Sequence, residues 1–153
     1  MAATQLLASS GAAETVCLGG NRQALDALGL TVIDDHMPLN GPLAAITNGL
    51  KWAIAHGHSA LLVVACDMPN ITGEMLAWLV DAPTSWDCCV IETNFGIEPL
   101  CALYSVSCHD TFARQLTNGE RSIQRAVRSV GYHGVHVANE SLVLNVNSPD
   151  DLA

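Results

Sequence analysis

Short apolar runs alternate with amphipathic segments along the chain, and this pattern predicts an α/β domain with a largely parallel sheet. The run 61–66 is apolar throughout, as expected of a central strand that is buried on both faces. Pro42 suits the first turn of a long amphipathic helix, and Gly57 ends that helix. The pattern predicts further strands at 14–19, 31–33, 88–93, 99–104, 134–138 and 142–146, and further helices at 3–10, 22–28, 108–117, 121–130, after Thr72 and from Ser148.

The length of 153 residues is typical of one domain, and no repeat, low-complexity segment or linker interrupts the sequence. We therefore expect a single domain over residues 1–153. The order of its elements is unusual. A doubly wound domain normally opens with a strand and a glycine-rich turn, whereas this chain opens with a helix.

Composition and charge exclude several classes of protein. Apolar residues make up 50% of the chain and charged residues 14%, which argues against disorder and against a solvated coiled coil. The net charge of −9 makes nucleic acid and anionic membranes poor partners, so a phosphate-bearing ligand would need backbone amides, a metal or local arginines. The run 61–66 is too short to span a bilayer, and no basic residue precedes Arg22, so we expect neither a membrane span nor a secretory signal.

The six cysteines show neither a C-x-x-C pair nor a zinc-binding spacing. Most lie in apolar segments, where a thiol behaves as a small buried hydrophobe, and this usage predicts a reduced, cytoplasmic protein. Cys66 stands next to Asp67, and we interpret it as a buried strand thiol rather than a nucleophile. The histidines show no metal-binding spacing and are interpreted as solvated or capping residues.

Two acidic residues follow predicted parallel strands, at the sheet edge where open α/β domains bind their ligands. Asp35 follows the strand 31–33, and Asp67 follows the strand 61–66. A carboxylate held there can coordinate Mg²⁺, which takes one or two protein carboxylates and fills its other positions with water and phosphate oxygens. The alternative for each residue is a solvated turn aspartate or a helix cap.

Asn145 and Asn147 follow the last predicted strand, and alternation places both amides on one face. Such a pair can bind a phosphate, a base or a metal, although Asx-turn chemistry before Ser148 is the alternative. Arg121, Arg125 and Arg128 have the spacing of one helix face and could bind an anion, unless that face is simply solvated.

Several sequence blocks resemble, in the same order, those of the molybdenum cofactor guanylyltransferases. The resemblance runs from about residue 14 to the end of the chain. The Asn-Val-Asn form of the last block looks more like the guanylyl than the cytidylyl branch. The blocks are Asn21-Arg22, 29–35 (GLTVIDD), 41–46 (GPLAAI), 64–69 (VACDMP), 98–104 (EPLCALY) and 145–152 (NVNSPDDL).

The resemblance implies a glycosyltransferase-A-like nucleotidyltransferase fold, in which a Rossmann-like, mainly parallel mixed sheet carries helices on both faces. It implies transfer of GMP from GTP to the terminal phosphate of molybdopterin, with release of pyrophosphate. By matching blocks, Asp67 would be the catalytic Mg²⁺ ligand, Asp35 would contact the guanine nucleotide, and Asn145 and Asn147 would line the side that receives the pterin phosphate. The remaining ligand-binding residues implied are Asn21 and Arg121.

The family's opening strand and its glycine-rich loop with an Arg and a Lys have no match in residues 1–20. We therefore expect an N-terminally short member of the family, without its first strand. That strand would lie between 14–19 and 61–66, so two strand edges should be unpaired unless they close together or a partner fills the gap.

Two other functions fit the same blocks: a non-catalytic molybdopterin-binding accessory module, and an inactive fragment that folds with a missing piece or as a swapped oligomer. The expected small-molecule partners are GTP and molybdopterin. A second copy of the chain, or molybdoenzyme and cofactor-biosynthesis proteins, are the expected macromolecular partners.

Overall fold

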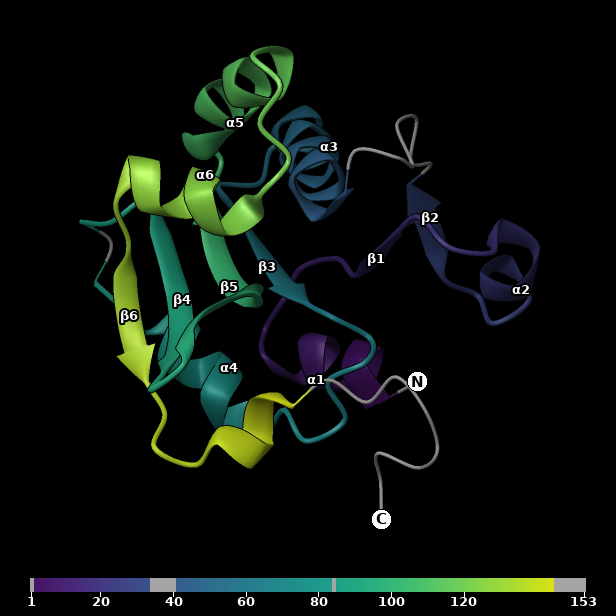
Figure 1. Ribbon diagram of the computed structural model, residues 1–153. Helices are drawn as coiled ribbons and strands as arrows, with labels where there is room; N and C mark the ends of the chain where they lie inside the picture. Colours follow the sequence, from purple (N-terminus) through teal and green to yellow (C-terminus); the bar gives the residue numbers. More distant parts are fainter. Residues whose placement is uncertain (1, 34–40, 84, 145–153) are drawn as a thin grey trace.

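The computed structural model describes residues 2–33, 41–83 and 85–144, and it contains two separate sheets (Figure 1). The larger sheet has the strand order β3-β5-β4-β6. Its strands are β3 (Ala60–Val64), β4 (Cys88–Thr93), β5 (Gly96–Ser105) and β6 (His133–His136). β5 is antiparallel to both of its neighbours and β6 is parallel to β4, so β3, β4 and β6 run in one direction.

The smaller sheet pairs β1 (Val16–Leu18) with β2 (Thr31–Ile33) in parallel, and α2 (Arg22–Asp26) forms the crossover between them. Asn21 begins α2 by accepting a hydrogen bond from the amide of Ala24. Gly29 follows α2 with a φ of 72°, a conformation that favours glycine. Among the described residues no ladder joins this sheet to the larger one, so the break expected between 14–19 and 61–66 is present there.

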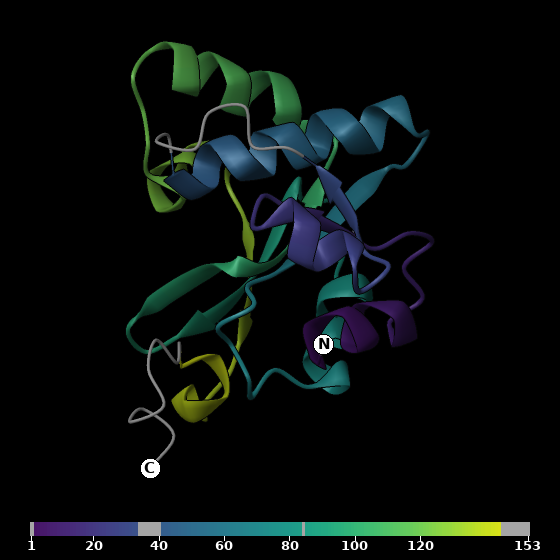
Figure 2. The same ribbon diagram turned by 90° about the vertical axis from the view of Figure 1, so that its right-hand side faces the viewer.

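Helices cover both faces of the larger sheet, as Figures 1 and 2 show. One face packs on α3 (Gly41–Ala55), α5 (Cys108–Thr117) and α6 (Ile123–Val130), and the core there includes Leu50, Tyr104 and Phe112. The other face packs on α4 (Gly73–Val80), with α1 (Ala2–Ser9) and the 3-10 helix η1 (Glu140–Val143) beside it. This arrangement confirms the predicted fold class. In the part of the chain that the structure describes, no helix has the length and apolar character needed to cross a bilayer.

Two predicted elements were wrong. The strand β3 is not a buried central strand, because among the described strands it pairs with β5 alone and every one of its residues is only half-buried. Residues 140–143 form η1, which takes in the first two residues of the strand predicted at 142–146, and residues 145–146 lie outside the described residues. The Asn139 side chain accepts hydrogen bonds from the amide and the hydroxyl of Ser141, a local turn that competes with strand pairing. The helix predicted from Ser148 lies outside the described residues.

Candidate functional site

A cavity of about 860 Å³ lies between β1 and β3. Its walls are formed by the two strands with the residues that follow them, by α1, and by Pro42, Ala45 and Ile46 of α3. At the amino ends of the strands, Nε2 of His58 lies 3.4 Å from Oε1 of Glu14. At the carboxyl ends the cavity is lined by Gly20, Asn21 and Asp67. Residues that follow β1 and residues that follow β3 therefore line the same cavity.

The turn after β3 holds Asp67 in place. The amide of Ala65 donates to the carbonyl of Leu100 on β5, with an N–O distance of 2.8 Å. One residue beyond Asp67, the buried Met68 anchors the turn in the core. Oδ1 of Asp67 is buried and has no hydrogen-bond partner among the residues described. Because a buried carboxylate oxygen without a partner is costly, this atom is suited to receive a cation.

A shift in the pairing register between β4 and β5 helps to hold this turn in place. Val90 pairs with Ala102 and Ile91 pairs with Glu98, so residues 99–101 of β5 have no partner on β4. The fully buried hydroxyl of Tyr104 donates to the carbonyl of Pro99, at 2.7 Å, and fixes this segment. Burial raises the pKa of Tyr104 well above its ordinary value, which keeps the hydroxyl protonated as the donor.

Asn21 reaches the same cavity from β1. Gly19 and Gly20, which have φ values of 74° and 97°, turn the chain out of β1 directly before it. Oδ1 of Asn21 caps α2, so its amide nitrogen is the group that it can offer to a ligand. The cavity thus brings together two of the predicted site residues, Asn21 and Asp67.

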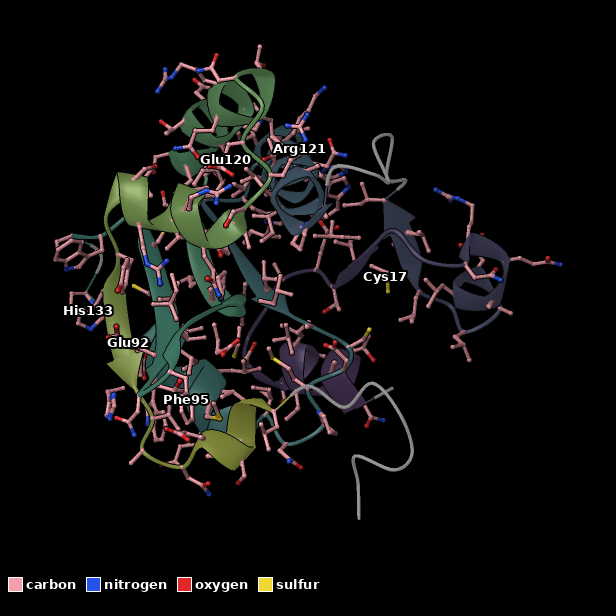
Figure 3. All side chains as sticks on the ribbon, viewed as in Figure 1. Cys17, Glu92, Phe95, Glu120, Arg121 and His133 are labelled. Carbon is pink, nitrogen blue, oxygen red and sulfur yellow. The ribbon has the colours of Figure 1, made fainter. Side chains whose placement is uncertain are left out.

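The other three predicted site residues of the strand ends, Asp35, Asn145 and Asn147, lie outside the described residues. Their placement in one crevice with Asp67 stays a prediction. The structure does describe Arg121, which does not line the cavity. Figure 3 shows Arg121 beside α3 and α5, and its carbonyl lies 3.7 Å from the point where a side chain at Gly41 would begin.

The prediction that Arg121 shares a helix face with Arg125 and Arg128 was wrong, because α6 begins only at Ile123. The guanidinium of Arg121 donates instead to the carbonyls of Leu116 and Glu120, at 2.9 and 2.8 Å.

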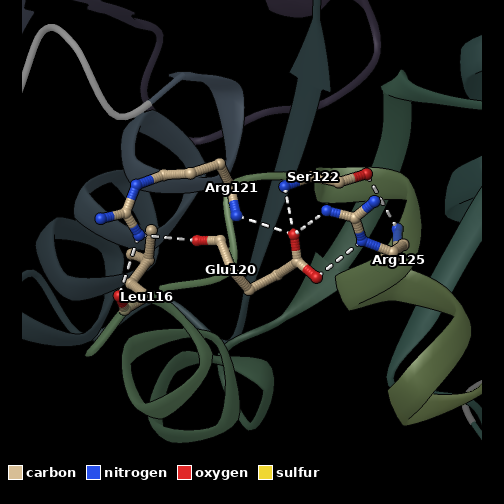
Figure 4. Close-up of polar contacts among 5 residues, drawn as sticks. All are labelled: Leu116, Glu120, Arg121, Ser122 and Arg125. Atoms are coloured by element: carbon tan, nitrogen blue, oxygen red, sulfur yellow. Dashed lines mark hydrogen bonds and ion pairs between the residues drawn. The ribbon is translucent and has the colours of Figure 1, made fainter. Parts of the chain in front are cut away.

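Glu120 forms an ion pair with a second arginine, Arg125 (Figure 4). Its carboxylate accepts two hydrogen bonds of 2.7 Å from the guanidinium of Arg125, and others from the amides of Arg121 and Ser122. These donors lower the pKa of Glu120 to about 2, with Arg125 as the largest cause. Arg125 therefore holds the start of α6 through Glu120, and Arg121 ties the end of α5 to the segment before α6. The sequence spacing alone could not show this.

Sequence reasoning also misjudged Cys66 and missed the stacked rings of Trp52 and His58 that line part of the cavity. Cys66 is exposed, because β3 ends at Val64 and Cys66 lies in the turn. His58 is not simply solvated, since it lines the cavity and stacks on Trp52 at 5.6 Å between ring centroids. The spacing of Trp52 and His56, one helical turn apart, is the signal that this helix end carries a ring cluster.

Among the residues that the structure describes, no group of three or more His, Cys, Asp or Glu side chains is placed to hold a metal ion. A cation at Asp67 would therefore take most of its ligands from water and from a bound ligand. That donor set is the one Mg²⁺ uses with phosphates.

Comparison with known proteins places this geometry in a family. The family model described as the MobA-like NTP transferase domain matches residues 1–135. A molybdenum cofactor guanylyltransferase of Cereibacter sphaeroides is 31% identical over 140 residues, which cover 90% of this chain and 70% of that protein.

Two solved structures share the fold. One is the molybdopterin-guanine dinucleotide biosynthesis protein A of Archaeoglobus fulgidus (TM-score 0.69, 24% identity, 90% of this chain and 73% of the other). The other is Rv0371C of Mycobacterium tuberculosis in complex with manganese (TM-score 0.64, 17% identity, 99% of this chain and 82% of the other).

Proposed function

The chain belongs to the family of MobA-like NTP transferase domains, and from this membership we propose that it is a molybdenum cofactor guanylyltransferase. The reaction would transfer GMP from GTP to the terminal phosphate of molybdopterin and release pyrophosphate. The observation that carries the proposal is the buried Oδ1 of Asp67, which has no hydrogen-bond partner among the described residues and lies in the cavity that residues following β1 and β3 line.

Phosphoryl and nucleotidyl transfer depend mainly on positioning and on neutralising charge, with little covalent chemistry for the protein. In this proposal Asp67 is the metal-binding residue, and the hydrogen bond from Ala65 to Leu100 fixes its distance from the sheet. Asn21 offers its amide nitrogen to the nucleotide from the opposite strand. The family resemblance assigns the guanine nucleotide to Asp35 and the pterin phosphate to Asn145 and Asn147.

The metal is a divalent cation, and we propose Mg²⁺. A single carboxylate with phosphate and water oxygens suits this ion, and the Mycobacterium tuberculosis neighbour is in complex with manganese, which prefers similar ligands. When bound, the metal would neutralise charge on the phosphates. The chain is acidic, with a net charge of −9, so it needs such a cation to hold a triphosphate.

Arg121 keeps a role in the proposal as a residue near the pterin substrate. Its guanidinium is already bonded to two carbonyls, so a phosphate would have to compete with them or use its remaining donors. We place the reaction in the cytoplasm, because all six cysteines are free, as expected in a reducing compartment.

The test is a transfer assay with the intact chain, GTP, Mg²⁺ and molybdopterin. We expect pyrophosphate release and a product with the mass of the guanine dinucleotide, and less product with CTP. Asp67→Asn should abolish transfer, whereas Asp81→Asn, an exposed residue at the end of α4, should not. Binding of molybdopterin without any transfer would favour the accessory-module alternative and reject the transferase.

A further inference from the structure

Two buried thiols lie in contact on the face of the larger sheet that packs on α3, α5 and α6. Cys88 is the first residue of β4 and Cys108 is the first residue of α5, and their Sγ atoms lie 3.4 Å apart. Cys88 is 0% exposed and Cys108 is 2% exposed. Neither residue lines the cavity, so the proposed transfer gives this pair no role.

Hydrogen bonds give the two thiols different parts. Sγ of Cys108 donates to the carbonyl of Asp87 at 3.3 Å, so the S–H of Cys88 is the donor within the pair. The hydrogen bond to Cys108, together with burial, raises the pKa of Cys88 well above its ordinary value. Cys88 therefore stays protonated, and the sulfur of Cys108 is the one that can react first.

The backbone holds the pair in place from both sides. Oγ of Ser107, directly before α5, donates to Oδ1 of Asp87 at 2.6 Å. The amide of Ser105 donates to the carbonyl of Asp87 at 2.8 Å, so the starts of β4 and α5 are tied together. A disulfide bond is about 2.0 Å long, so the two sulfur atoms need to approach by roughly 1.4 Å.

The sheet separates this pair from the other buried cysteines. Cys88 and Cys108 belong to the core on the α3 side, whereas Cys89 and Cys101 belong to the core on the α4 side. The two remaining cysteines line the cavity, which the pair does not. Each thiol of the pair therefore has one partner within reach.

We propose that Cys88 and Cys108 form a reversible redox site, which hydrogen peroxide oxidises to an intramolecular disulfide and a small dithiol reduces again. Both sulfur atoms are buried, so the oxidant has to be small, and hydrogen peroxide meets this requirement. Disulfides of cytoplasmic proteins are mostly transient and redox-sensing, which fits a bond that forms only under oxidation.

The oxidation takes two steps. The sulfur of Cys108 loses its proton to water and attacks one peroxide oxygen, so that an S–O bond forms, the O–O bond breaks and hydroxide leaves. The sulfur of Cys88 then attacks the sulfur of Cys108, the S–S bond forms, and the S–O bond breaks. The departing hydroxide takes the proton of Cys88 and leaves as water. In sum, two thiols and one peroxide give one disulfide and two waters.

The disulfide closes a loop over residues 88–108, which contains both strands of the β4–β5 hairpin and the segment 99–101. Such a cross-link restricts the unfolded chain and so stabilises the folded one. We expect oxidation to raise the Tm by at least about 5 °C, and dithiothreitol to reverse the rise. The proposal needs neither GTP nor a metal, so it stands or falls separately from the transferase activity.

The experiment is disulfide mapping of the intact chain after treatment with hydrogen peroxide, with circular dichroism to show that the chain is folded. Remaining thiols are blocked with iodoacetamide, and the chain is cleaved after glutamate and analysed by mass spectrometry without reductant. Cleavage at Glu92 and Glu98 places Cys88 and Cys108 on different peptides, which only a disulfide can hold together. We expect these two peptides to appear joined, and to separate after treatment with dithiothreitol.

Each cysteine of the pair has a matched control on its own peptide. Cys88→Ala and Cys108→Ala should abolish the joined peptides. Cys89→Ala and Cys101→Ala, which also change buried cysteines, should leave them joined. If a variant does not fold, fragmentation of the joined wild-type peptides still identifies the linked sulfur atoms.

Three results would overturn the proposal. The first is the absence of joined peptides at peroxide concentrations that fully oxidise the exposed Cys66. The second is a joined pair that persists in Cys108→Ala, because another cysteine would then form the bond. The third is a disulfide that forms only in urea, because the folded chain would then not bring the two thiols together for reaction.

Discussion

Tyr104→Phe should destabilise the protein without opening a cavity in its core. The substitution removes the hydroxyl that donates to Pro99, at 2.7 Å, and keeps the ring that packs edge-on against Phe112 at 5.9 Å. Tyr104 is 0% exposed and Pro99 is buried, so water cannot replace the lost donor. A buried acceptor left without a partner costs about 1–3 kcal/mol, and we expect the free energy of unfolding to fall by that amount.

The assay is urea unfolding, followed by circular dichroism, of the wild type and of Tyr104→Phe. Tyr132→Phe is the matched control, because its hydroxyl donates to Glu92 at 3.2 Å from a half-buried position where water can take its place. That control should lose at most about 1 kcal/mol. Because burial raises the pKa of Tyr104, the loss should be the same at pH 6 and at pH 9.

The same substitution should reach the candidate site. Without the hydrogen bond from Tyr104, the backbone at Pro99 is held less firmly. The neighbouring carbonyl of Leu100, which accepts the hydrogen bond from the amide of Ala65, should then be held less firmly too. Hydrogen exchange of the Ala65 amide should therefore be faster in Tyr104→Phe than in Tyr132→Phe. If the two variants lose equal stability and Ala65 exchanges at an unchanged rate, the supporting role of the β5 irregularity is refuted.

Three further predictions concern charge and accessibility. The pKa of Glu120 is about 2 in the folded chain and lies below its ordinary value of 4.5, so its bonds to Arg125 stabilise the fold above about pH 4.5 and are lost as the pH falls towards 2. In Glu120→Gln, the free energy of unfolding should therefore fall less than in the wild type as the pH drops over that range. An equal fall in the two proteins would contradict this. Iodoacetamide should label the exposed Cys66 before the buried Cys88, whose pKa is raised by the neighbouring Cys108 thiol and by burial, and GTP with Mg²⁺ should slow the labelling of Cys66. Without metal, Asp67→Asn should raise the Tm by about 2–4 °C, because the unpartnered oxygen then carries no charge; a fall in Tm would show that Asp67 has an unrecognised stabilising partner.

Local signals in the sequence were sufficient to predict most of the helices. Pro42 stands at the start of α3, and Thr72 caps α4 by accepting from the amide of Met75. Such signals act within one turn of chain, so they need no knowledge of the rest of the fold. Asp67 was predicted as a candidate site residue for a similar reason, because it directly follows the most apolar strand, and the structure places it in the cavity.

Features that depend on distant pairing were not predictable. The run 61–66 is apolar on both faces, but apolarity does not say which neighbour pairs with a strand, and β3 proved to be half-buried at a free edge. The spacing of Arg121 and Arg125 suggested one helix face, yet Glu120 and Ser122 start the helix after Arg121. The irregularity at 99–101 is defined by register against two other strands, which no local pattern encodes.

The central claim is that Asp67 holds a divalent cation with the nucleotide, and Mn²⁺ binding followed by electron paramagnetic resonance tests it most directly. With GTP present, we expect the wild type and Asp81→Asn to bind Mn²⁺ with the same affinity. Asp67→Asn should bind it at least about tenfold more weakly. Equal affinity in Asp67→Asn would show that the metal, if it binds, is held elsewhere.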